Sequence, residues 1–171
     1  MEYYAKIEQK NSKDTESIIK LSSHKNYNTI QYIEIYFDSP ANADKKADMI
    51  DMTVVIKGKL DTKNRTNAKL MTEWALTNSS SPSAYRNLTV WIIGDGVNNI
   101  ENPIYKKITL TYAFVVDYKE NYDKLTGKDN STYEITLKQK KDELSEIKIE
   151  ASGLKFDPAR EGFEVEKKEG N

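Results

Sequence analysis

The chain has 171 residues, a length typical of one domain, with 37% hydrophobic and 31% charged residues. Its 26 basic and 27 acidic residues leave a formal net charge of −1, which argues against nucleic acid or an anionic membrane surface as partner. The absence of cysteine excludes disulfide bonds, thiolate catalysis and cysteine metal sites. Neither a secretory signal nor a run of about 20 apolar residues is visible, so we expect cytoplasmic synthesis without membrane insertion.

The first half of the chain is predicted to be mostly β-strand. A polar excursion at residues 38–48, with Pro40 and the pair Lys45-Lys46, separates two segments rich in Ile, Val, Tyr and Phe. Both segments are typical of strands, and two weaker candidates precede them. The strands predicted here span residues 1–10, 17–22, 29–37 and 51–59.

One segment has the spacing of a helix instead. Between residues 64 and 77 the apolar side chains recur every three or four positions, so they fall on one helical stripe. Asp61, Thr62 or Thr66 can cap its start, and the Ser- and Pro-rich residues 78–83 end it. A single amphipathic helix in a mostly-β chain must pack against a sheet or close the end of a barrel.

The second half of the chain is again predicted to be β-strand. Residues 88–93 are almost continuously apolar, as in a strand covered on both faces. Residues 107–118 alternate strictly, which predicts one long strand with a single buried face. That face would carry Ile108, Leu110, Tyr112, Phe114, Val116 and Tyr118. A polar connection at 119–130 leads to strands at residues 132–139 and 146–150.

These elements predict a mostly-β domain over residues 1–150. We expect a β-barrel or sandwich of about eight antiparallel strands with one amphipathic α-helix packed outside. Residues 151–171 form a charged C-terminal extension, and from residue 153 onward we expect it to be loosely held.

Residues with catalytic potential are few. His24 is the one histidine, and its polar neighbours are typical of a surface position. Phosphate-loop, nucleophile-elbow and dinucleotide-binding motifs do not occur. We therefore predict no catalytic, cofactor-binding or metal-binding residues. The tyrosines are interpreted as core and interface side chains, with an aromatic platform for sugars or bases as the alternative.

The order of elements and three sequence segments resemble a known family. The segments are the helical Asn-Ala-Lys-Leu-Met-Thr-Glu-Trp at 67–74, Leu-Thr-Val-Trp-Ile at 88–92 and Ile-Thr-Leu-Thr-Tyr-Ala at 108–113. They resemble the haemolysin-coregulated protein, the inner-tube component of type VI secretion, which is related to the tail tubes of contractile phages and phage-tail-like particles. The return from Tyr133 to Leu137 fits the hairpin of that family.

The resemblance implies a structural role without enzymatic activity. Subunits would join edge to edge into rings, usually hexameric, that stack into a hollow tube surrounded by sheath, baseplate and spike proteins. The assembled tail or injection particle is then released or secreted. As ring-stacking contacts we predict Ser39, Pro40, Asn42, Asp44, Lys45 and Lys46. As lumen-facing side chains we predict Lys107, Thr109, Thr111, Glu134, Thr136 and Lys138.

Two other classes of function stay open from the sequence. One is a carbohydrate- or peptide-binding β-sandwich that presents Trp91 or the tyrosines on an exposed groove. The other is an enzyme with a carboxylate pair, because the many acidic residues place some pair at any chosen spacing.

Overall fold

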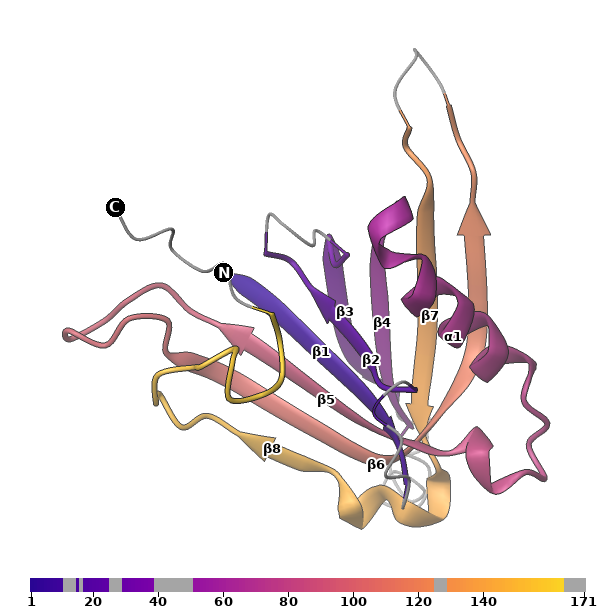
Figure 1. The fold of residues 1–171 in the computed structure, drawn as a ribbon. Helices are drawn as coiled ribbons and strands as arrows, with labels where there is room; N and C mark the ends of the chain where they lie inside the picture. The colour runs from indigo at the N-terminus through magenta and orange to yellow at the C-terminus, as the bar shows by residue number, and fades with distance from the viewer. Residues whose placement is uncertain (11–14, 16, 25–28, 39–50, 125–128, 165–171) are drawn as a thin grey trace.

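The structure, a computed structural model, describes residues 1–10, 15, 17–24, 29–38, 51–124 and 129–164. Within these residues eight strands lie in one antiparallel sheet beside one α-helix (Figure 1). None of the described helices is long and apolar enough to cross a membrane. The strands are β1 (Glu2–Gln9), β2 (Ile19–Ser22), β3 (Tyr32–Asp38), β4 (Asp51–Lys59), β5 (Arg86–Ile93), β6 (Ile104–Asn121), β7 (Thr132–Gln139) and β8 (Lys148–Glu150).

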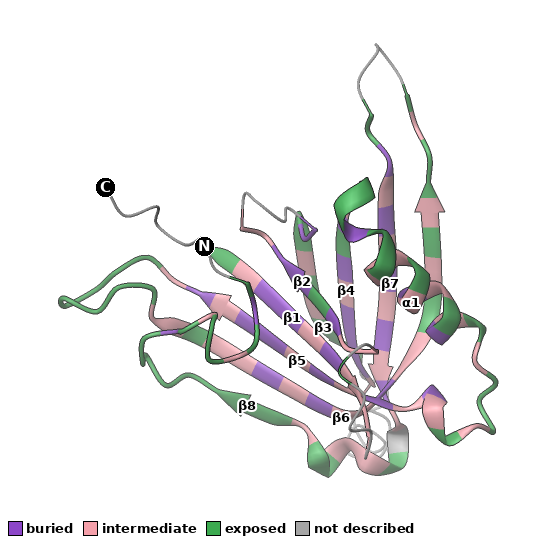
Figure 2. Cartoon of the chain, viewed as in Figure 1, coloured by how far each residue is buried: buried purple, intermediate pink, exposed green. Residues whose placement is uncertain are grey.

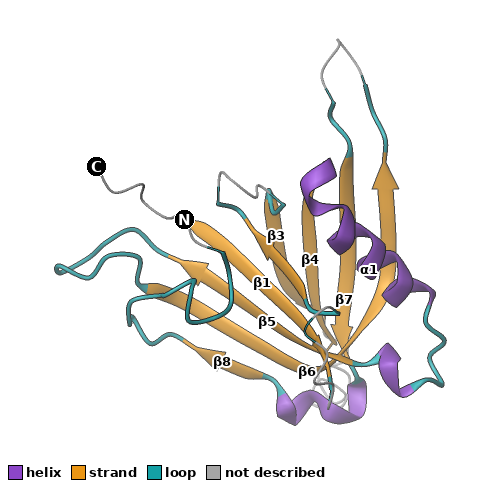
Figure 3. Cartoon of the chain, in the orientation of Figure 1, coloured by secondary structure: helices purple, strands orange, loops and turns teal. Residues whose placement is uncertain are grey.

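The long strand β6 holds the sheet together. The strand order is β2-β1-β5-β6-β7-β4-β3, so β6 lies in the middle of the sheet (Figure 3). Its first half pairs with β5 and, on the other side, with β8, whereas its second half pairs with β7. The sheet therefore has two arms that meet in β6: β2-β1-β5 on one side and β7-β4-β3 on the other.

The two arms also meet where β2 ends. The backbone amides of Thr29 and Ile30 donate to the carbonyl of Ser22 at 2.9 and 3.1 Å. One residue later, the amide of Gln31 donates to the carbonyl of Lys57 in β4 at 2.8 Å. The chain that leads into β3 thus links β2 to β4, and the sheet curls around its core.

The core lies inside this curl and is made by alternate side chains of the strands (Figure 2). In β7, for example, buried and half-buried residues alternate along the whole strand. The α-helix α1 (Arg65–Leu76) packs against β6 and β2 and adds two buried side chains, Met71 and Trp74. The Trp74 indole donates a 2.8 Å hydrogen bond to the carbonyl of Ala84, which fixes the turn before β5.

The fold predicted from the sequence is confirmed. The chain is mostly β, with eight antiparallel strands and one amphipathic helix packed beside them. Asp61 caps the start of the helical segment as predicted. Its carboxylate accepts hydrogen bonds from the amides of Lys63 and Asn64 in a 3-10 turn (Thr62–Asn64) that continues into α1.

Candidate assembly surfaces

The outer face of β7 carries three of the predicted lumen-facing residues, Glu134, Thr136 and Lys138. They are half-buried and alternate with core side chains of the same strand. The Lys138 ammonium lies 3.7 Å from the carboxylate of Asp51 in β4, and Glu134 lies 3.3 Å from the ammonium of Lys119 in β6. This part of the sheet is thus a polar surface in which charges of opposite sign sit side by side. That it lines a channel stays a prediction.

The other three predicted lumen-facing residues lie on the first half of β6. Lys107 is opposite Trp91 of β5 and Glu150 of β8, and its ammonium lies 3.5 Å from the Glu150 carboxylate. Thr109 is half-buried, opposite Thr89. The Thr111 hydroxyl is buried from solvent without a hydrogen-bond partner among the described residues.

The strict alternation predicted for residues 107–118 is wrong in the middle of β6. Ala113 is fully buried, whereas Val116, expected inside, is 49% exposed. The register with β5 shifts between Arg86 and Leu88, and the register with β7 shifts between Val115 and Asp117. Each irregularity adds one residue on β6 relative to its partner strand. The side chains that face the core therefore switch from even-numbered to odd-numbered positions at the first irregularity and back to even-numbered positions at the second.

The rim of the sheet at β3 is open among the described residues, because β3 pairs only with β4. Its exposed side chains include three aromatic residues, Tyr32 at 47%, Tyr36 at 37% and Phe37 at 55% exposure. A seven-residue edge strand with exposed aromatic side chains presents unpaired backbone groups next to apolar surface. This combination is typical of a strand that pairs with another chain.

The predicted ring-stacking contacts lie outside the described residues. Ser39, Pro40, Asn42, Asp44, Lys45 and Lys46 all fall between β3 and β4, in the stretch 39–50. Their role stays a prediction.

The C-terminal extension is not loosely held over residues 153–164, contrary to the prediction. Phe156 and Phe163 are buried, at 3% and 7% exposure, against Tyr4 of β1 and Trp91 of β5. The ring centroids of Phe156 and Tyr4 are 4.6 Å apart, and those of Phe163 and Trp91 are 5.9 Å apart. Backbone hydrogen bonds along the start of β6 hold the same segment, as from the amide of Ile104 to the carbonyl of Leu154 at 2.8 Å.

This aromatic cluster changes the interpretation of Trp91. With 2% of its surface exposed, Trp91 cannot present its ring on an open groove, as a sugar-binding sandwich would need. The sequence does contain a signal for the cluster, since Phe156 and Phe163 are the main apolar residues of a charged segment. Their partners, however, lie far away in the chain.

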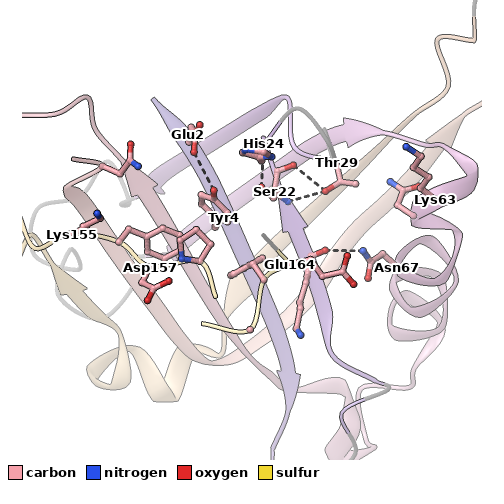
Figure 4. A pocket seen from close by; sticks show the side chains of 17 residues that line it. Glu2, Tyr4, Ser22, His24, Thr29, Lys63, Asn67, Lys155, Asp157 and Glu164 are labelled. Atoms are coloured by element: carbon pink, nitrogen blue, oxygen red, sulfur yellow. Dashed lines mark hydrogen bonds between the residues drawn. The ribbon is translucent and has the colours of Figure 1, made fainter. Parts of the chain in front are cut away.

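A cavity next to the extension has a volume of about 1300 Å³ and lies between the extension, β1, β2 and the start of α1 (Figure 4). His24 lines it, with its backbone amide 3.0 Å from the Ser22 hydroxyl. Burial raises the pKa of the Tyr4 phenol to about 12, and the nearby Glu2 carboxylate adds to the effect. The described residues contain no group of three or more acidic or histidine side chains placed to hold a metal ion.

Sequence comparisons find no match to a family model or to a curated protein, but solved structures share the fold. A mutant form of the Hcp1 protein from E. coli EAEC 042 pathovar is 11% identical, with a TM-score of 0.50 over 88% of this chain and 99% of that one. A crystal structure of an Hcp protein gives 0.51 at 8% identity, over 80% and 88% of the two chains.

A chain in the anti-feeding prophage baseplate, solved by cryo-EM with 6-fold symmetrisation, also has a TM-score of 0.51. It is 10% identical, and the match covers 89% of this chain and 94% of that one. The structural likeness therefore extends over most of the chain and nearly the whole of each similar protein. The resemblance to the haemolysin-coregulated protein that the sequence predicts is confirmed as a shared fold.

Proposed function

We propose that this chain is a structural subunit of the inner tube of a contractile injection apparatus. Copies of it form rings, and the rings stack into a hollow tube. The observation that carries the proposal is the fold shared with Hcp proteins and with a chain of the anti-feeding prophage baseplate. The open aromatic rim of β3 supports it independently, because pairing with another chain satisfies such a rim.

In this proposal the ring forms by sheet pairing between the β3 rim of one copy and a different rim of its neighbour. Such a head-to-tail contact closes into a ring when each step turns by a fixed fraction of the circle. We take the ring to hold six copies, in keeping with the 6-fold symmetrised baseplate that contains one of the similar chains.

The polar outer face of β4, β6 and β7 then lines the channel. Its charged side chains occur in pairs of opposite sign, such as Lys119 with Glu134 and Lys138 with Asp51. A wall of this kind stays hydrated, and its long-range field is weak because the charges nearly cancel. Passage through such a channel does not depend on the charge of what passes.

The remaining partners follow from the same proposal. A tube subunit made in the cytoplasm assembles with sheath, baseplate and spike proteins and leaves the cell as part of a released or secreted particle. Two of the structural matches come from Hcp proteins and a third from a baseplate, so the chain is suited to the tube itself or to its first ring.

Electron microscopy of the purified protein tests the proposal. We expect rings or tubes with a central channel for the unmodified chain. A variant with Tyr36→Lys and Phe37→Lys places two charges on the exposed side chains of the β3 rim, which disfavours strand pairing without touching the core. This variant should keep its circular-dichroism spectrum and sediment as a single subunit.

The matched control for this variant is Leu76→Lys. Leu76 is 79% exposed at the end of α1, away from the rim, so a positive charge introduced there should leave rings intact. The proposal is wrong if the unmodified protein stays monomeric at high concentration. The assignment of the β3 rim alone is wrong if the double variant forms normal rings.

A further inference from the structure

The connection between β5 and β6 is a hairpin with a fixed shape, here called the Asn hairpin (residues 94–103). Val97 and Ile100 face each other across its tip through two backbone hydrogen bonds of 3.1 and 3.0 Å. Between them Asn98 and Asn99 have φ values of 52° and 65°. Two successive positive φ values define the tight type I′ turn, for which asparagine is a preferred residue. The tip is thus ordered before it meets any partner.

The Asn hairpin exposes apolar side chains at this tip. Val97 is 59% exposed and Ile100 40%, although both are branched aliphatic residues. Its charged residues are Asp95 and Glu101, with side chains 97% and 81% exposed, and it contains no basic residue. Glu101 contacts Lys155 at 3.6 Å, but an ion pair this exposed contributes little and exchanges easily.

A hollow of about 380 Å³ lies at the other end of the same strands, here called the tyrosine hollow. Its residues are Gln9, Lys10, Pro82, Ser83, Tyr85 and Tyr112. The Lys10 ammonium lies 2.8 Å from the centroid of the Tyr112 ring, and the Lys140 ammonium lies 5.3 Å from that of Tyr85. The hollow therefore has aromatic walls and the Lys10 ammonium at its margin, in contrast to the acidic and aliphatic tip. Lys140 lies beside it, and its ammonium is also 3.3 Å from the carboxylate of Asp142.

The hairpin and the hollow lie at opposite ends of β5. Tyr85 immediately precedes the strand and Gly94 immediately follows it (Figure 1). Eight residues of strand separate them by about 26 Å. A subunit cannot fill its own hollow with its own hairpin. A second copy in the same orientation, moved along the strand direction, can do so.

We propose that the Asn hairpin of one copy seats in the tyrosine hollow of the next copy. Val97 and Ile100 pack against the two tyrosine rings, and the acidic residues of the hairpin approach Lys10 and Lys140. The occupant is a second copy of this chain because the aliphatic, acidic tip suits the aromatic hollow with its Lys10 ammonium, and because the two surfaces lie at the two ends of one strand.

This contact rests on the proposed function for its place in the tube. Edge pairing through β3 extends the sheet across the strands, around the ring. A contact between strand ends runs in the other direction, so it joins one ring to the next. Two different surfaces that meet head to tail without closing generate an open stack, which is the geometry of a tube.

Charge reversal tests the contact by electron microscopy. Lys10→Glu with Lys140→Glu makes the hollow margin acidic, and Asp95→Lys with Glu101→Lys makes the hairpin basic. Each double variant alone should form rings that do not stack, with tube length reduced at least tenfold. All four changes in one chain restore opposite charges and should restore tubes. Normal tubes in both double variants, or loss of the rings themselves, would overturn the proposal.

Disulfide cross-linking tests directly whether the Asn hairpin contacts the tyrosine hollow of the next copy. Introduced cysteines have no competing thiol, because the chain has no cysteine of its own. In a variant with Val97→Cys and Ser83→Cys, mild oxidation should give a ladder of covalent oligomers on a denaturing gel. The control variant, Val97→Cys with Leu76→Cys, should give no ladder. A ladder without rings would support the contact and contradict the ring, whereas rings and tubes without a ladder would contradict the contact alone.

Discussion

At the scale of single residues, Gly58 decides how the two arms of the sheet meet. A Cβ atom at this position would lie 1.7 Å from the carbonyl oxygen of Thr29 and 2.8 Å from the Tyr133 ring. The same carbonyl accepts a hydrogen bond from the Tyr133 hydroxyl. Glycine is required here because the backbone that closes the curl passes directly over β4.

We therefore expect Gly58→Ala to lower the free energy of unfolding by about 3 kcal/mol, because the methyl group displaces the Thr29 backbone and strains its bond to Tyr133. Urea denaturation measures the loss. Gly94→Ala is the matched control, since its nearest neighbours would be 3.8 Å from the new Cβ, and it should change the stability by less than about 1 kcal/mol. Equal effects of the two changes would contradict the close-approach argument.

Thr53 is a residue whose replacement should increase stability, because its buried hydroxyl group lowers the free energy of unfolding. It is fully buried in β4, and its hydroxyl has no hydrogen-bond partner among the described residues. Thr53→Val replaces the hydroxyl by a methyl group of similar size, so we expect a gain of about 1 kcal/mol in unfolding free energy. Thermal denaturation measures it.

The control for this change is Thr29→Val. The Thr29 hydroxyl accepts a 2.9 Å bond from the amide of Ser22, which the substitution leaves unsatisfied. It should therefore lower the stability by about 1–3 kcal/mol. A loss of stability in Thr53→Val as well would mean that the Thr53 hydroxyl has a partner.

At the scale of elements, periodicity predicts the strands and the helix but not the irregularities inside them. The alternation in residues 107–118 identifies β6 correctly, and the three- and four-residue spacing identifies α1. The two register shifts within residues 107–118 could not be predicted, because a bulge depends on which residues the neighbouring strands place opposite it. Strict alternation therefore predicts the wrong face for the side chains between the shifts.

The C-terminal segment escaped prediction for a related reason. Its composition is charged, and composition alone predicts a loosely held tail. The phenyl side chains of Phe156 and Phe163, seven positions apart, suffice to anchor the segment. They can do so only because β1 and β5 bring Tyr4 and Trp91 together on one face of the sheet. Such a long-range meeting of aromatic residues leaves no local pattern in the sequence.

This anchoring can be tested with Phe156→Ala. Loss of the ring exposes Trp91, so we expect a red shift of tryptophan emission and a decrease in unfolding free energy of up to about 3 kcal/mol. The other tryptophan, Trp74, points from α1 into the main core, so the wavelength of its emission should stay unchanged. In a Trp91→Phe background the red shift should disappear. A shift that persists there would show that the core itself has loosened.

At the scale of the whole molecule, one curled sheet presents a polar outer face and an aromatic rim at β3, which pairs only with β4 among the described residues. The sequence predicts both kinds of side chain, and the structure shows how they are distributed: the ion-paired face spans β4, β6 and β7, and the rim follows β3. A tube built through that rim turns the same face of every copy toward the axis. The outer face of β4, β6 and β7 in each subunit then supplies the side chains of the channel wall.

Access to a single cysteine tests which face lines the channel. In assembled tubes Thr136→Cys should react slowly with a bulky maleimide-polymer reagent, since the reagent cannot diffuse far into a closed channel, while a small maleimide still reaches it. Leu76→Cys on the exposed end of α1 should react with both reagents at similar rates. In subunits dispersed by the β3 substitutions, the protection of Thr136→Cys should vanish. If the bulky reagent modifies Thr136→Cys equally fast in tubes and in dispersed subunits, the outer face of β7 lies outside the channel.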